Sequence, residues 1–152
     1  MKGIYWARRT LGFTGILASA VEHHAVLDAV EWLVAHEGAC VTWLEVDDQG
    51  RVHPSVLEEA LGDDVALVTC MWANNEVGTV QPIRVLASLA RAAGVPFHTA
   101  AVQAVGQRHV AFPASGVDAL TLSGPKLGGP SGAGGVLPGW HTRQPPLPTG
   151  WR

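Results

Sequence analysis

The sequence of 152 residues lacks the features that mark several large classes of protein. It has only two cysteines, Cys40 and Cys70, which lie in apolar surroundings and form no CxxC pair, so we expect no disulfide framework and a reducing, cytoplasmic setting. It has no apolar run of about 18 or more residues, so we expect no membrane span. It has no stripe of lysine or arginine and a formal net charge of −3, so no nucleic-acid partner is expected.

The composition is that of a folded protein. With 47% hydrophobic residues and 15% charged residues, the chain has enough apolar material for a core and does not resemble a disordered chain. Its length is that of one domain. The first 21 residues loosely imitate a secretory signal, with Arg8-Arg9 followed by an apolar run that ends in Ala18-Ser19-Ala20. Glycine and threonine residues interrupt that run, so we expect no export.

Hydrophobic periodicity predicts alternating helices and strands. Helices are predicted at residues 22–37, 54–61 and 83–93, and strands at residues 39–46, 65–71, 95–98, 117–122 and 136–137. The run 65–71 is almost wholly apolar, as is typical of a strand buried on both faces of a parallel sheet. The alternation predicts an α/β fold, a three-layer sandwich with a mostly parallel sheet. The end of the chain, with three of the 10 prolines and no periodicity, is predicted to be a disordered tail.

Polar residues follow three of the predicted strands. In an open α/β sheet, ligands bind beyond the carboxyl ends of the strands. Asn75 follows the second strand, His98 ends the third and Gln103 comes after it, and Ser123 and Lys126 follow the fourth. Lys126 lies in a glycine-rich turn with no acidic neighbour in sequence, where desolvation could remove its proton and allow a Schiff base with a carbonyl group. From its chemistry alone, a solvated loop lysine is the simpler interpretation.

Other chemistry is weakly indicated. The glycine-rich run 128–135 lacks the GK[ST] ending of a phosphate-binding P-loop. The histidines His23, His24 and His36 have neither HExxH spacing nor a cysteine pair nearby, so no metal site is predicted. Cys40 and Cys70 are interpreted as small apolar core residues rather than as nucleophiles.

Five motifs, taken together, resemble one known family. They are VEHHAVL at residues 21–27, ANNEVGTVQPI at 73–83, FHTAAVQAVG at 97–106, GVDAL at 116–120 and SGPKLGGP at 123–130. In order and spacing they resemble the cysteine desulfurases (NifS/IscS-like), a branch of the class V aminotransferases among the fold-type I pyridoxal-phosphate (PLP) enzymes. The resemblance implies that residues 18–138 form part of a PLP-transferase large domain. A divergent N-terminal segment, 1–17, precedes it and the tail, 139–152, follows it.

The resemblance also implies roles for individual residues. Lys126 would hold PLP as a Schiff base and be the catalytic lysine, and His23 would stack on the pyridine ring. Asn75 and Gln103 would hydrogen-bond the ring substituents, and Ser123 would bind the cofactor phosphate. The implied reaction moves the sulfur of L-cysteine to an enzyme persulfide and leaves L-alanine, for iron–sulfur cluster or thio-cofactor assembly. The implied partners are L-cysteine, a second copy or a complementing chain, and a sulfur acceptor protein that the sequence does not identify.

Departures from the family pattern weaken the expected activity. The family's aspartate that pairs with the pyridine nitrogen falls at Ala100, which weakens the electron sink, and its histidine before the lysine falls at Pro125. The phosphate-binding turn and the catalytic cysteine loop of the family are not recognised, and neither Cys40 nor Cys70 lies at the nucleophile position. We therefore expect a form truncated at both ends and inactive as an isolated chain. The alternatives are a non-catalytic paralogue, as a binding module or gene remnant, and a sister PLP lyase such as selenocysteine lyase.

Overall fold

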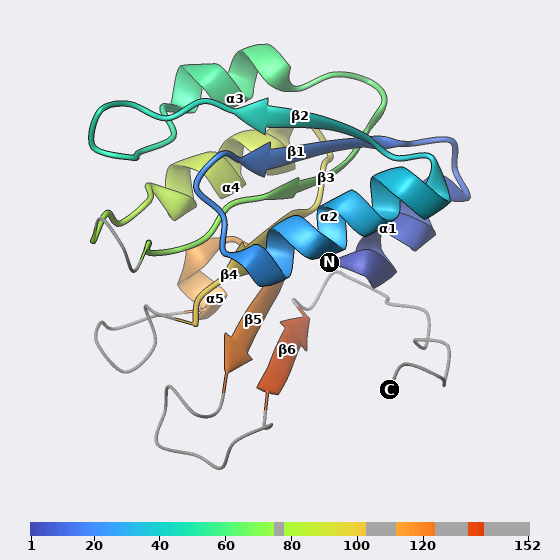
Figure 1. The fold of residues 1–152 in the computed structure, drawn as a ribbon. Helices are drawn as coiled ribbons and strands as arrows, with labels where there is room; N and C mark the ends of the chain where they lie inside the picture. The colour runs from blue at the N-terminus through green and yellow to red at the C-terminus, as the bar shows by residue number, and fades with distance from the viewer. Residues whose placement is uncertain (75–77, 103–111, 124–133, 139–152) are drawn as a thin grey trace.

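The computed structural model describes residues 1–74, 78–102, 112–123 and 134–138, which form one sheet with helices on both faces (Figure 1). The helices are α1 (Lys2–Arg9), α2 (His24–Glu37), α3 (Pro54–Ala60), α4 (Ile83–Ala92) and α5 (Phe112–Ser115). The strands are β1 (Gly15–Ser19), β2 (Cys40–Leu44), β3 (Val65–Thr69), β4 (Phe97–Ala100), β5 (Ala119–Ser123) and β6 (Gly134–Pro138). None of the described helices has the length and apolarity that a membrane crossing requires.

The six strands lie in the order β2-β1-β3-β4-β5-β6. All neighbouring pairs are parallel except the last, in which β6 runs antiparallel to β5. The prediction of a mostly parallel α/β sheet is therefore confirmed. The predicted strand at residues 136–137 lies within β6, whereas the predicted disordered tail, 139–152, lies outside the described residues.

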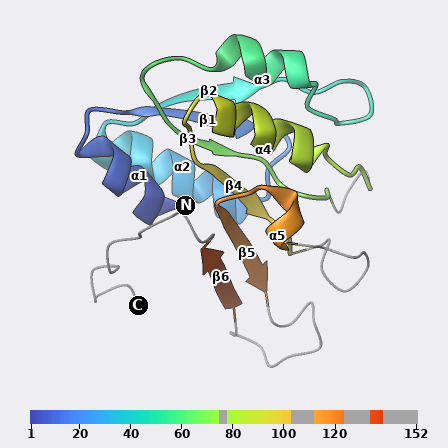
Figure 2. The ribbon, with the colours of Figure 1, turned by 180° about the vertical axis from the view of Figure 1, so that it is seen from behind.

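Two hydrophobic cores lie on the two faces of the sheet, because successive strand side chains point to opposite faces. In β1, Leu17 joins the core under α3 and α4, while Ile16 and Ala18 join the core under α1 and α2. Figures 1 and 2, seen from opposite sides, show these two pairs of helices on opposite faces of the sheet. The sheet and its two helix layers make the three-layer sandwich expected from the alternating pattern.

The sequence analysis predicted no element before residue 22, but the structure has two. β1 lies between β2 and β3 and is buried at all five positions. α1 buries Ile4 and Tyr5 against the α2 side of the sheet. The divergent segment 1–17 thus contributes a helix and part of an interior strand.

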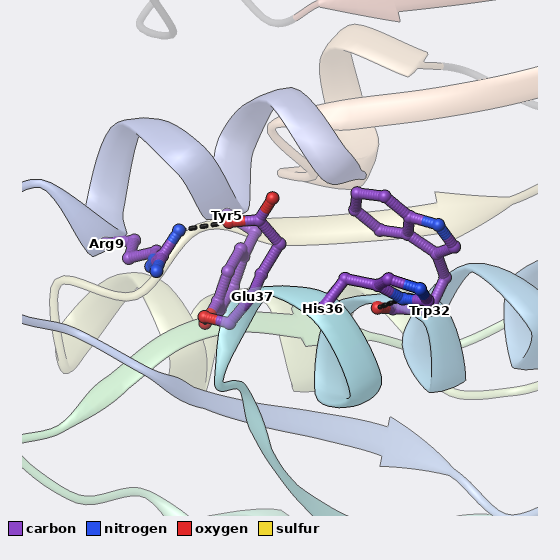
Figure 3. Close-up of polar contacts among 5 residues, drawn as sticks. All are labelled: Tyr5, Arg9, Trp32, His36 and Glu37. Carbon is purple, nitrogen blue, oxygen red and sulfur yellow. Dashed lines mark hydrogen bonds and ion pairs between the residues drawn. The ribbon is translucent and has the colours of Figure 1, made fainter.

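Side chains of α1 and α2 hold these two helices together (Figure 3). Arg9 forms an ion pair with Glu37, and the hydroxyl of Tyr5 donates a hydrogen bond of 3.4 Å to the carbonyl oxygen of Glu37. The ring of Trp6 on α1 meets the ring of Trp32 on α2 edge to face, with their centroids 6.4 Å apart, and within α2 the rings of Trp32 and His36 stack at 4.8 Å. The ion pair is partly exposed and is therefore a small contribution, so the buried residues of α1 supply most of the stabilisation.

Gly38 ends α2 in a left-handed conformation, with φ +68° and ψ +28°. No atom lies within 4 Å of the position that an added Cβ would take, so a substitution there meets conformational strain without a clash. We expect Gly38→Ala to lower the free energy of unfolding by about 1 kcal/mol, because a side chain disfavours this conformation. Gly38→Asn should cost less, since asparagine tolerates it better. Urea denaturation measures both, and equal stability of Gly38→Ala and wild type would contradict the prediction.

Candidate functional site

A cavity of about 430 Å³ lies at the carboxyl ends of the strands. Four parts of the chain line it: the start of α2, the segment after β3, the end of β4 with the residues that follow, and the end of β5. The lining residues are His23, Ala25, Val26, Met71, Ala73, Ala100, Val102, Thr121, Leu122 and Ser123. This is the place that parallel α/β sheets offer to ligands, and the volume suits a cofactor-sized molecule.

His23, at the N-cap position of α2, forms part of the cavity wall. Its backbone is extended (φ −69°, ψ 145°), and its Nδ1 accepts a hydrogen bond of 3.2 Å from the backbone N–H of Ala25. An accepting Nδ1 places the proton of the neutral ring on Nε2 and fixes the direction of the ring. The imidazole therefore lines the cavity in a fixed orientation, which fits the stacking role that the resemblance implies.

Thr121 and Ser123 bring two hydroxyl groups to the cavity from β5. The Oγ1 of Thr121 lies 2.8 Å from Nε2 of His98, and Nδ1 of His98 lies 2.9 Å from Oγ1 of Thr69. These contacts link β3, β4 and β5 by side chains. Burial lowers the pKa of His98 to about 3, so the ring is neutral at ordinary pH. His98, a polar candidate from the sequence, thus lies inside the sheet and holds Thr121 in the cavity wall.

Ala100 ends β4 and lines the cavity with a methyl group. This is the position at which the family's aspartate falls. The described lining contains an imidazole, two hydroxyls and apolar groups but no carboxylate. These groups fit a flat ring that bears a phosphate, since aromatic, apolar and hydroxyl contacts are all present. Among the described lining residues, nothing pairs with a protonated ring nitrogen.

The structure brings two of the five predicted site residues, His23 and Ser123, to one cavity although they lie far apart in sequence. Asn75, Gln103 and Lys126 lie outside the described residues. The side chain of Asn74, next to Asn75, donates a hydrogen bond of 3.0 Å to the carbonyl oxygen of Val21. This contact ties the segment after β3 to the loop that leads into α2, so both segments keep their place at the cavity.

Sequence reasoning missed part of the cavity lining. The sequence pattern predicts Met71 as the end of an apolar strand and Val26 as a helix core position, and both residues also line the cavity. Their apolar character carries no sign of a ligand, because core and cavity positions look alike in sequence. In the described parts of the chain, no three histidine, cysteine, aspartate or glutamate side chains come together as a metal-binding set.

Comparisons with known proteins show the family of this chain. The family described as aminotransferase class-V matches residues 7–148. The IscS-like cysteine desulfurase of Mycobacterium tuberculosis is 54% identical over 141 residues, which cover 90% of this chain and 36% of that protein. The cysteine desulfurase IscS of Methanosarcina thermophila is 43% identical over 136 residues, which cover 90% of this chain and 33% of that protein.

Solved structures show the same likeness. A NifS-like protein superposes with a TM-score of 0.86 at 30% identity, over 99% of this chain and 43% of that chain. The structure described as SspA in complex with cysteine superposes with a TM-score of 0.82 at 33% identity, over 89% of this chain and 38% of that chain. This chain thus spans about a third of the length of the curated relatives that it matches.

Proposed function

Since the chain belongs to the aminotransferase class-V family, we propose that it forms the PLP-binding part of a cysteine desulfurase. The family is PLP-dependent, and the curated relatives described above are named cysteine desulfurases. The proposed reaction transfers the sulfur of L-cysteine to an enzyme cysteine and leaves L-alanine. The observation that carries the proposal is the meeting of His23 and Ser123 at one cavity beyond the strand ends.

Each residue of the proposed site has a distinct task. His23, oriented by the N–H of Ala25, covers one face of a bound ring. The hydroxyl of Ser123 donates to the cofactor phosphate, and Lys126 holds the cofactor covalently. The apolar lining, with Met71 among it, keeps water from the reacting atoms. When bound, PLP supplies an electron-accepting ring, which the protein positions and tunes.

A second function is favoured by one specific observation. Ala100 presents a methyl group where a carboxylate would keep the ring nitrogen protonated. The ring is then a weaker electron acceptor, so the second candidate is a protein that binds PLP without turning over cysteine. Sulfide release from L-cysteine by the PLP-loaded protein separates the two. A homodimer or complementing chain, a sulfur acceptor protein and a cytoplasmic location remain predictions.

The test of the cofactor site uses the two lysines of the chain, Lys2 and Lys126. Purified wild type, Lys126→Ala and the control Lys2→Ala are mixed with PLP, and the visible absorbance is recorded. We expect a bound-cofactor band in wild type and Lys2→Ala and complete loss of the band in Lys126→Ala. Borohydride reduction followed by mass spectrometry should then place the cofactor mass on the peptide that contains Lys126. Equal spectra for all three proteins would overturn the proposal.

A further inference from the structure

Glu22 is a buried carboxyl group directly behind the cavity wall. Its side chain is only 7% exposed. Both carboxyl oxygens are buried, and neither accepts a hydrogen bond of ordinary geometry from any described residue. Carboxylates are almost never fully buried unless they are paired, so a group of this kind requires an explanation.

The neighbours of Glu22 among the described residues carry no positive charge that would favour its ionisation. Ser19 ends β1 and Cys70 directly follows β3; both residues are fully buried, and β1 and β3 are adjacent strands. Burial raises the pKa of the Cys70 thiol, and the charge of Glu22 would raise it further, so the thiol also stays neutral. His23, which follows Glu22, forms no ion pair with it, and no other cationic side chain among the described residues does so.

The same surroundings favour the uncharged acid. Burial raises the pKa of Glu22 to about 8, and the backbone N–H groups of Met71 and His23 oppose this rise only in part. Met71 and His23 are themselves lining residues of the cavity. The carboxyl group therefore lies next to the backbone of two residues that face the ligand, although Glu22 itself does not line the cavity.

We propose that Glu22 is kept as an uncharged carboxylic acid behind the cavity and thereby keeps the cavity able to bind an anionic, phosphate-bearing cofactor. The inference rests on the proposed function, because it takes PLP as the ligand. An ionised Glu22 would repel the cofactor phosphate across a poorly solvated wall. An ionised Glu22 would also attract the backbone N–H groups of Met71 and His23. This attraction would shift both residues and change the positions of their side chains in the cavity wall. Glu22 is thus a positioning residue, which acts through charge and through its neighbours.

The test compares the affinity for PLP of wild type and Glu22→Gln between pH 6.5 and pH 9. Glutamine has the same shape and cannot ionise, and Glu31→Gln, an exposed change on α2, is the matched control. Every other titrating group is common to the proteins, so the ratio of affinities reports Glu22 alone. We expect equal affinities at pH 6.5 and about tenfold weaker binding by wild type than by Glu22→Gln at pH 9. Glu31→Gln should follow wild type at every pH.

A second measurement needs no cofactor. The apoproteins are melted between pH 4 and pH 9, and we expect the melting temperature of wild type to fall relative to Glu22→Gln as the pH rises to about 8. A difference in melting temperature that is independent of pH would overturn the proposal. PLP binding with the same pH dependence in wild type and Glu22→Gln would overturn the role of Glu22 alone. No PLP binding by any of the proteins would overturn the proposed function, and this role with it.

Discussion

Wild type is expected to lose on the order of 4 kcal/mol of stability, relative to a His98→Gln variant, as the pH falls from 6.5 to about 3. The reason is that burial lowers the pKa of His98 from 6.5 to about 3. Between these values the unfolded chain binds a proton at His98 and the folded chain does not. Protons therefore favour unfolding as the pH falls, and each pH unit of that interval contributes about 1.4 kcal/mol. Above pH 6.5 neither state is protonated there, and the full stability is present.

The measurement is urea denaturation of both proteins at pH 7, 5 and 3.5. At pH 7 we expect His98→Gln to be less stable than wild type by about 2 kcal/mol, because the contacts to Thr69 and Thr121 are disturbed. At pH 3.5 the order should reverse. His53→Gln makes the same replacement at an exposed position and is the control. A difference between wild type and His98→Gln that stays constant over this range would contradict the expectation.

Phe97→Ala is expected to lower the free energy of unfolding by about 3–5 kcal/mol. Phe97 is fully buried in β4 and belongs to the core beneath α3 and α4, together with Leu86 and Val117. Removing the ring takes away its burial and leaves a cavity, because close-packed neighbours relax only in part. The strand itself should persist, since the backbone N–H of Phe97 donates to a carboxylate oxygen of Asp118 at 2.9 Å and does not depend on the ring.

Two control variants separate this loss of packing from a general disturbance. Phe97→Leu keeps most of the apolar volume and should cost about 1–2 kcal/mol. Val85→Ala, on α4, removes apolar atoms from a side chain that is 49% exposed and should change stability by no more than about 0.5 kcal/mol. The measurement is the midpoint urea concentration of unfolding, compared among variants whose free energy of unfolding has the same slope against urea concentration. A cost for Phe97→Ala as small as that for Val85→Ala would show that β4 is not part of the packed core.

The predicted helices and strands were mostly found, because their signals are local. The run that became β3 is almost wholly apolar, and the helix signals around α2 and α4 repeat with helical spacing. β1 has no such signal, since it is short and begins with Gly15. A Cβ at Gly15 would lie 3.2 Å from the carbonyl oxygen of Asp64 and from the Cα of Val65. The glycine therefore serves close strand packing, which no local pattern reveals.

Only part of the site could be predicted from the sequence, for a related reason. The motifs identified His23 and Ser123, and the rule that ligands bind beyond strand ends predicted the edge at which they meet. Neither predicted that Thr121 lines the cavity or that His98 holds it there. Those facts depend on the register between β4 and β5, in which Ala100 lies opposite Thr121.

The sequence by itself determined the fold class, the family and two of the residues that line the cavity, His23 and Ser123. Periodicity and motifs are properties of neighbouring residues, so they can be recognised along the chain. Only the tertiary structure decided the charge states of Glu22 and His98, because a pKa depends on solvent exclusion by segments from distant parts of the chain. For the same reason, only the tertiary structure made β1 a central strand, flanked by β2 and β3.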